Sequence, residues 1–167
     1  MGFSLSFHRI AGDQPADADR AGLADFLESR GLHVVADGFG SGSILDGDDQ
    51  PLRFDGDWSD IHLSPLDQDA PLSGGIFHAT LSGEECEFVY DLCIAGGFLV
   101  ANHQGSPLIV VPSYNHSLED VSAIDPGDIA WVESAVEFRE AVTDGFEQFI
   151  AYRDRVLLRD ESEMSDS

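Results

Sequence analysis

The segment from residue 76 to 112 constrains the fold more than any other part of the sequence. It contains the nearly continuous apolar runs FVYDLCIAGGFLV and PLIVVP, which are rich in β-branched and aromatic residues. Glycines at 83, 96, 97 and 105 divide it at a spacing typical of hairpins. The segment therefore predicts four strands, at 76–81, 87–94, 98–102 and 107–111, that form an antiparallel meander.

The segments before and after this region carry local signals for both strands and helices. Apolar and polar residues alternate over 3–8, which predicts a half-buried strand. Asp19 follows as a helix cap, and Gly31 is a natural stop for a helix that ends near Arg30. A strand over 32–35 comes next. Near the other end, Ser134 and Glu137 form an S-x-x-E capping box, which opens a helix to about residue 142, and a second helix is expected after residue 144.

These elements predict an α+β fold: an antiparallel meander with an N-terminal helix and two C-terminal helices packed on one face. Residues 36–75 are rich in turn formers, and short strands are expected there at 43–45, 52–54 and 61–63. The length of 167 residues fits one domain over 1–159, and the acidic tail 160–167 is expected to be disordered.

The charge balance is the most unusual property of the chain. It has 32 acidic residues against 8 basic ones, a formal net charge of −24, and all eight basic residues are arginine. Such a field repels nucleic acid and anionic membranes and speeds association with basic proteins. The alternative is that the acidity serves only solubility or salt adaptation.

Cysteine use and the N-terminus predict a cytoplasmic location. Cys86 and Cys93 are seven residues apart, so on one strand they would face opposite ways and could not pair. Two buried free thiols fit a reducing compartment. The start of the chain has no signal-peptide pattern, and no apolar run is long enough to span a membrane.

The densest charge lies between residues 46 and 69, which hold eight aspartates and a single arginine. Aromatic residues embedded among these carboxylates suit an interface, because aromatic side chains anchor it and charges steer the encounter. The predicted partner-binding residues are Asp46, Asp48, Asp49, Phe54, Asp55, Asp57, Trp58 and Asp60. Two alternatives remain: a solvated loop whose aspartates form turns, and a calcium site, although both DGD sequences break the EF-hand pattern.

Motifs for catalysis and metal binding are missing from the sequence. The six histidines have no metal-ligand spacing, no C-x-x-C occurs, and no G-x-S-x-G occurs. The glycine loop GFGSGS is interpreted as a hairpin turn, because no helical pattern follows it. We therefore predict neither a cofactor, a metal site nor an enzymatic activity. A hydrolase-like site in which His78, His103 and His116 meet an aspartate stays open as an alternative.

Together these features resemble the small acidic immunity proteins of bacterial polymorphic and contact-dependent toxin systems. The resemblance rests on size, acidity, the absence of an export signal, few cysteines in an α+β pattern, and the closing segment SAVEFREAVTDGFEQFIAYRD. It implies a protein that neutralises a cognate basic toxin by covering its active site, without binding nucleic acid or membrane. The alternatives are a DNA mimic or acidic regulator and the hydrolase-like enzyme.

Overall fold

The computed structural model describes residues 3–38, 41–103 and 107–143. In chain order the elements are β1 (Leu5–Ala11), β2 (Gln14–Ala16), α1 (Arg20–Ser29), β3 (His33–Ala36), β4 (Gly42–Leu45), β5 (Arg53–Phe54), β6 (Asp57–Trp58), β7 (His62–Leu63), β8 (Gly74–Ile76), α2 (Gly83–Gly96), β9 (Leu99–Asn102), β10 (Ile109–Pro112), the 3-10 helix η1 (Pro126–Asp128) and β11 (Ile129–Val132). Residues 135–143 are also helical.

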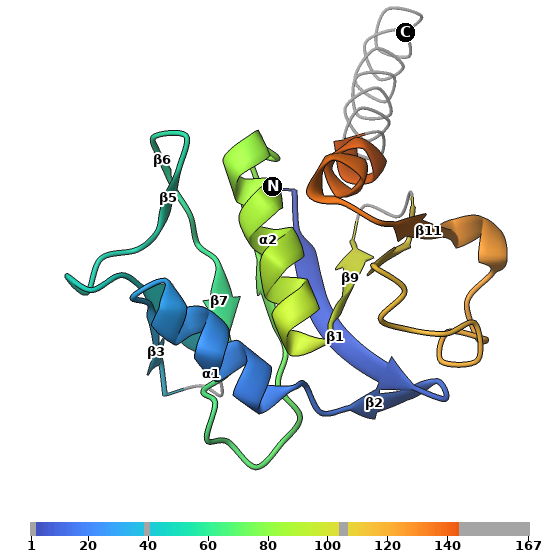
Figure 1. The fold of residues 1–167 in the computed structure, drawn as a ribbon, viewed down its shortest axis with the longest axis horizontal. Helices are drawn as coiled ribbons and strands as arrows, with labels where there is room; N and C mark the ends of the chain where they lie inside the picture. Colours follow the sequence, from blue (N-terminus) through green and yellow to red (C-terminus); the bar gives the residue numbers. More distant parts are fainter. Residues whose placement is uncertain (1–2, 39–40, 104–106, 144–167) are drawn as a thin grey trace, which may run out of the picture.

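One large, mostly antiparallel sheet organises these elements. Its strand order is β11-β10-β9-β1-β8-β7-β4-β3, with β2 paired to the far end of β1. Only the β10–β11 pair is parallel. The N-terminal strand β1 therefore lies at the centre of the sheet, between β8 and β9 (Figure 1). The expected α+β class with a mainly antiparallel sheet is confirmed.

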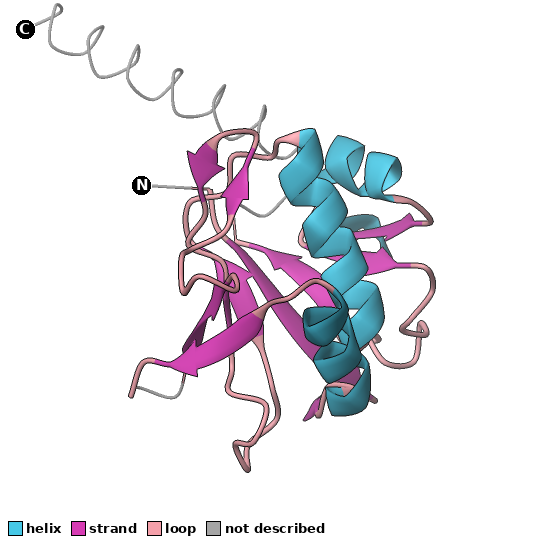
Figure 2. Ribbon diagram, turned by 60° about the vertical axis from the view of Figure 1, so that its left-hand side comes forward, coloured by secondary structure: helices cyan, strands magenta, loops and turns pink. Residues whose placement is uncertain are grey.

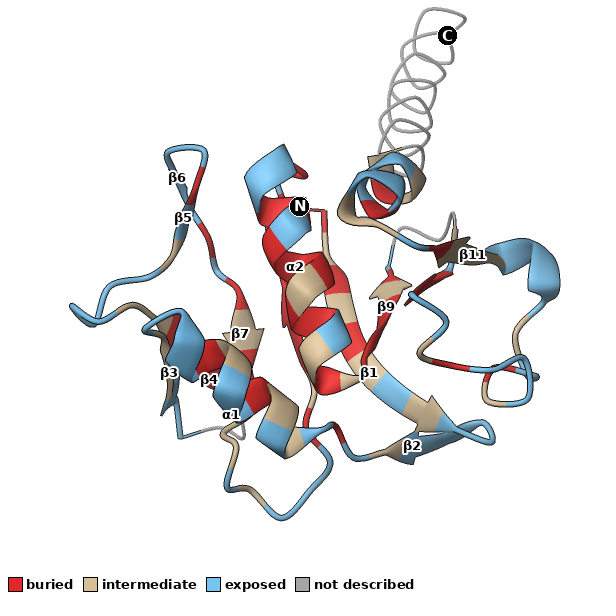
Figure 3. Cartoon of the chain, viewed as in Figure 1, coloured by how far each residue is buried: buried red, intermediate tan, exposed pale blue. Residues whose placement is uncertain are grey.

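The helices α1 and α2 cover one face of the sheet (Figure 2). The alternation predicted for the first strand explains which face this is: Leu5 and Phe7 are buried, while Ser6 and His8 lie on the other side. The core under the helices is continuous from Phe3 to Val142, and Figure 3 shows the buried positions concentrated on α2 and β1. Covering one face with helices thus supplies most of the apolar burial that stabilises the domain.

The segment 87–94 is a helix and not the predicted strand. It belongs to α2, which packs against the sheet and α1 and buries a wide face that includes Phe88, Val89 and Leu92, while a narrow stripe with Glu84, Glu87 and Ile94 stays exposed. Because the buried face is wide, the apolar run from 88 to 93 is interrupted only by Asp91, and such a short apolar run does not distinguish a helix from a central strand. The predicted four-strand meander is corrected accordingly: α2 crosses over between β8 and β9, and β1 fills the gap between these two strands.

Close contact between α1 and α2 depends on two glycines. A Cβ atom at Gly22 would lie 2.3 Å from the carbonyl oxygen of Ala95, and one at Gly96 would lie 2.7 Å from the Phe98 ring. The Asp19 carboxylate caps α1 by accepting a hydrogen bond from the Gly22 amide, as predicted, and the Asp19 amide donates to the carbonyl of Gly96. The start of α1 is therefore fixed to the end of α2.

The first predicted C-terminal helix is confirmed. Ser134 accepts a hydrogen bond from the Glu137 amide, and Phe138 and Val142 are fully buried against the main core. The second predicted C-terminal helix and the acidic tail 160–167 lie outside the described residues. Within the described residues, none of the helices has the length and hydrophobicity needed to cross a membrane.

A second, smaller core lies on the opposite face of the sheet. Leu99, Ile109, Val111 and Val121 form its centre. The chain between β10 and β11 folds back over this face, which closes one end of it. The remainder of that face carries polar side chains of β1 and is not covered by α1 or α2.

Candidate functional site

The hairpin β5–β6, here called the arm, pairs outside the main sheet (Figure 1). Phe54 pairs with Asp57, and Asp55 and Gly56 between them both have positive φ, of 51° and 88°. This is the geometry of a type I′ turn, for which Asp-Gly is a preferred sequence. The second DGD sequence therefore forms a tight turn, and the structure shows no group of three or more potential metal ligands among its described residues.

Phe54 does not present its ring for binding. It is 6% exposed, and its ring lies 5.2 Å from that of Phe88 on α2. The expectation that Phe54 contacts a partner is corrected: it holds the arm against the core. The Asp55 amide adds a second tie by donating to the Glu84 carboxylate at 2.6 Å.

Trp58 is the exposed aromatic residue of the arm. Its side chain is 54% exposed, and the guanidinium of Arg53 lies 3.6 Å from the ring centroid. This cation–π contact covers one side of the indole and fixes its orientation. The arm thus presents a pre-oriented indole ring next to the carboxylates of Asp55 and Asp57.

Three of the predicted aspartates have structural roles. Asp46 accepts hydrogen bonds from the amides of Asp48 and Gln50, which is the turn-forming alternative. Asp49 lies 2.8 Å from His33 on β3. Asp60 accepts from the amides of Phe77 and His78, and it also bonds the His78 ring at 2.6 Å.

The remaining residues of the predicted set form a smaller candidate surface. They are Asp48, Asp55, Asp57 and Trp58, and all four are exposed. The three carboxylates make no hydrogen bond with any residue that the structure describes. A partner with positive charge could therefore bind them without first breaking an internal contact.

The arginines of the described part are all engaged within the chain. Arg20 donates to Asp17 and to three carbonyl groups of the 66–70 loop, and Arg30 pairs with Asp91. Arg9 and Arg139 donate to backbone carbonyls, and Arg53 lies over Trp58. Because the positive charges are used internally, the carboxylates dominate the exposed surface of these residues.

The three histidines of the hydrolase-like alternative belong to separate networks. His78 bonds Asp60, His103 bonds Ser6, and His116 bonds Asn115 and the amide of Ile10. His116 is buried, and burial lowers its pKa, with Asp120 opposing this shift and Arg9 adding to it. The Nε2 atom of His116 accepts a hydrogen bond from the Ile10 amide, so this nitrogen carries no proton, as in a neutral imidazole.

A serine between two histidines lies on the face of the sheet away from the helices. The Ser6 hydroxyl is 2.8 Å from Nε2 of both His8 and His103. Burial and the neighbouring His103 lower the pKa of His8. Within the described residues, no carboxylate contacts either ring, so the cluster lacks the third group that orients the base in nucleophile–base–acid sites.

Sequence reasoning missed an aromatic groove on the segment after β10. Tyr114 and Trp131 stack with ring centroids 5.9 Å apart, and they line a cavity of about 570 Å³ together with Asn115, His116, Ser117 and Leu118. Tyr114 and Leu118 are 64% and 65% exposed. The two aromatic residues are 17 positions apart in the sequence and carry no motif, so only the fold brings them together.

The backbone at this groove is unusual. Ser113 and Tyr114 have φ values of 48° and 53°, a region that residues with side chains rarely occupy. Such conformations cost about 1–3 kcal/mol each and persist where surrounding contacts hold them. Here Ser113 donates its amide to Val132, and Asn115 donates its side chain to the carbonyl of Phe98 at 2.7 Å.

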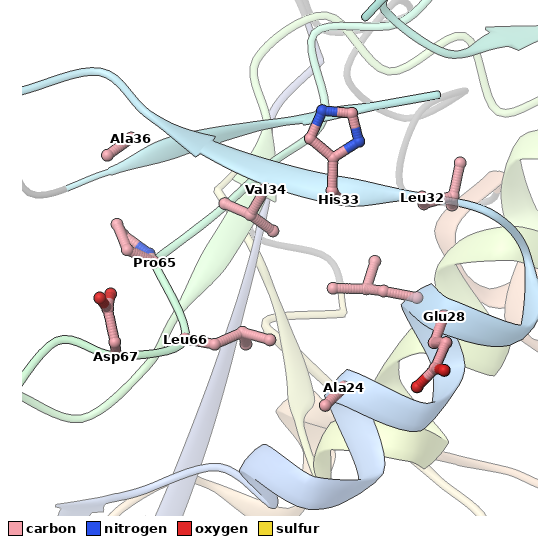
Figure 4. A pocket seen from close by; sticks show the side chains of 10 residues that line it. Ala24, Glu28, Leu32, His33, Val34, Ala36, Pro65, Leu66 and Asp67 are labelled. Carbon is pink, nitrogen blue, oxygen red and sulfur yellow. The ribbon is translucent and has the colours of Figure 1, made fainter. Parts of the chain in front are cut away.

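A second cavity, of about 580 Å³, lies between α1 and the edge strand β3 (Figure 4). Leu27, Val34 and Leu66 give it an apolar lining, and Glu28 and Asp67 lie at its two sides. The ring of His33 is already bonded to Asp49. This cavity therefore offers a hydrophobic surface without a set of converging polar groups.

Both cysteines are buried free thiols, as predicted. The expected reason for their not pairing, opposite faces of one strand, does not apply. Both lie on the same side of α2, where a spacing of seven residues separates them by about two helical turns. Burial raises the pKa of Cys86 to about 12, and burial also raises the pKa of Cys93. Neither thiol has the exposure or the thiolate character of a reactive cysteine.

Comparisons of the chain with protein-family models, with curated proteins and with known structures found no match.

Proposed function

We propose that the chain is an acidic binding protein of the cytoplasm that neutralises a cognate basic toxin by covering its active site, as an immunity protein does. The observation that carries this proposal is the arm, where an exposed, pre-oriented Trp58 lies beside carboxylates that have no hydrogen bond to any described residue. An aromatic anchor of this kind supplies buried contact, and the carboxylates steer a basic partner.

The charge of the described surface supports the same proposal. The chain has a net charge of −24, and every arginine of the described part is engaged internally. Long-range attraction by such a surface raises association rates with basic proteins by about 10- to 1,000-fold at low salt. Nucleic acid and anionic membranes are repelled by the same field and are not proposed as partners.

The test is capture of the partner in cells of the native source, with the full chain as bait at physiological salt. We expect a stoichiometric complex with one basic protein whose expression alone arrests growth, and relief of that arrest when the full chain is co-expressed. The variant Asp55→Asn/Asp57→Asn/Trp58→Ala should lose the relief.

The matched control is Asp25→Asn/Asp69→Asn, which removes two exposed carboxylates away from the arm. It should protect cells as well as the wild type does. Absence of a stoichiometric basic partner, or protection that the arm variant retains in full, would reject the proposal. A partner that duplex DNA displaces would indicate nucleic-acid mimicry instead.

A further inference from the structure

The groove formed by Tyr114, Leu118 and Trp131 has features of a binding site that the arm does not share. Two of these three side chains are about two-thirds exposed, although they are apolar. The groove also lies on a different part of the molecule: the arm extends beyond β7, whereas this segment joins β10 to β11 at the opposite end of the sheet (Figure 1).

The groove is held in shape by contacts beneath it. The Tyr90 hydroxyl bonds the Ser113 hydroxyl at 2.5 Å, and the His116 ring accepts the amide of Ile10 at 3.1 Å. These bonds fix two consecutive residues with positive φ, so the exposed Tyr114 ring is presented in one position. A binding surface fixed before the partner arrives loses less conformational entropy on association.

The stretch of chain that lines the groove is acidic, which favours a cationic ligand. The stretch 107–133, which forms all of its lining, contains Glu119, Asp120, Asp125, Asp128 and Glu133 and no lysine or arginine. His116 at the groove is neutral near pH 7, because its burial lowers its pKa. The stretch itself therefore supplies no positive charge to complement these acidic residues; Arg9 of β1 acts on His116 from outside the stretch and donates to the Asp17 carbonyl.

Two other aromatic rings of the described chain are covered by an arginine. The Arg53 guanidinium lies over Trp58, and that of Arg30 lies 4.5 Å from the centroid of Phe26. Among the described residues, no arginine covers Tyr114 or Trp131. Planar guanidinium groups stack on aromatic rings better than ammonium groups do.

We propose that this groove binds an arginine side chain of a basic protein partner, with the guanidinium against the exposed Tyr114 ring and the aliphatic stem along Leu118. This inference deepens the proposed function and rests on it for the basic nature of the partner. It adds a second contact whose chemistry is specific for arginine, in addition to the steering charges of the arm.

The test uses a peptide probe, acetyl-Gly-Arg-Arg-Gly-amide, and its citrulline analogue, which has the same shape without the charge. Binding to the full chain is followed by amide chemical shifts at 0.15 M salt. The arginine peptide should produce saturable shifts at residues 114–118 and 131, and the citrulline peptide should not. An equal response to a lysine peptide would reject the preference for arginine.

Matched variants locate the site. Tyr114→Leu keeps an apolar side chain but removes the ring, and we expect the dissociation constant to rise at least fivefold. Tyr114→Phe keeps the ring and should stay within twofold of the wild type, as should Phe77→Leu, which removes an exposed ring outside both the groove and the arm. Unchanged urea midpoints show that the variants fold.

Two results would overturn the inference: equal affinity of Tyr114→Leu and the wild type, or shifts spread over the acidic loops with none at the groove. Because the probe is a defined peptide, the result does not depend on the toxin. Peptide binding without a captured toxin would reject the proposed function and support the groove as an arginine site. A captured toxin without peptide binding would support the proposed function and reject the arginine site.

Discussion

Glu85 shows how a single buried carboxylate can organise the chain around it. It is 2% exposed and accepts hydrogen bonds from the amides of Thr80 and Leu81 and from the Thr80 hydroxyl. Burial raises its pKa, and the three hydrogen bonds oppose that shift. The contact holds Leu81 at a φ of 58° and fixes the turn that leads from β8 into α2.

Replacing Glu85 with alanine should lower the free energy of unfolding by about 1–3 kcal/mol, because two amides would lose their acceptor. Glu85→Gln keeps an oxygen that accepts both amides and removes the charge, so its change should stay below about 1 kcal/mol. Urea denaturation at pH 7 measures both values. Equal losses in the two variants would contradict the assigned role.

His116 and His8 make stability depend on pH. Burial lowers the pKa of both, so the folded state favours the neutral imidazole. Between that lowered pKa and the unfolded value near 6.5, the unfolded chain binds more protons, and stability falls as the solution is acidified. This contribution is complete above about pH 6.5 and is lost as the pH falls below it.

The variant His116→Gln should therefore weaken the decline in unfolding free energy between pH 7.5 and 5.5. Glutamine keeps an acceptor for the Ile10 amide without an ionisable ring. The measurement is urea denaturation across that pH range. A smaller decline of the unfolding free energy should remain in the variant, because His8 is still present. A decline as steep as in the wild type would contradict the assignment.

At the scale of elements, the crossing of α1 and α2 is set by glycine. Gly22→Ala places a methyl group 2.3 Å from the Ala95 carbonyl, so the helices must separate. The expected loss in the free energy of unfolding is about 1–3 kcal/mol, which is typical of overpacking.

Gly83→Ala is the control. Gly83 lies in the first turn of α2 with open space around it, and its replacement should be neutral or slightly stabilising. Thermal unfolding of both variants checks this, and equal effects would argue against close packing.

The same two helices show how far the sequence alone could predict the fold. Asp19 and Gly31 fixed the limits of α1 because capping is local chemistry. For α2 the local signal was also present, in the S-x-x-E pattern of Ser82 and Glu85 before the run 87–94, and the Ser82 hydroxyl accepts the Glu85 amide. It was outweighed by β-branched and aromatic residues, which a helix with a wide buried face carries as readily as a strand does.

The candidate site was predicted in part for a similar reason. The acidic segment and Trp58 could be found by composition, but burial of Phe54 and the structural roles of Asp46, Asp49 and Asp60 depend on contacts with distant residues. The groove at Tyr114 could not be found at all, because its two rings meet only through the parallel pairing of β10 and β11.

At the scale of the whole molecule, two features separate stability from binding. The core depends on α2, β1 and the helix over 135–143, whereas the arm contributes to it mainly through Phe54. Removing the arm's exposed groups should therefore leave stability almost unchanged. The variant Asp55→Asn/Asp57→Asn/Trp58→Ala should unfold within about 1 kcal/mol of the wild type, as is usual for surface changes. A larger loss in urea denaturation would mean that the arm is chiefly structural.

The association rate between the chain and its captured basic partner, measured from about 0.05 to 0.5 M NaCl, tests the central claim most directly. The rate should fall at least tenfold over that range, and at physiological salt the arm variant should bind at least tenfold more weakly than both the wild type and Asp25→Asn/Asp69→Asn. A rate insensitive to salt, together with equal affinities for the arm variant and the control, would contradict the account.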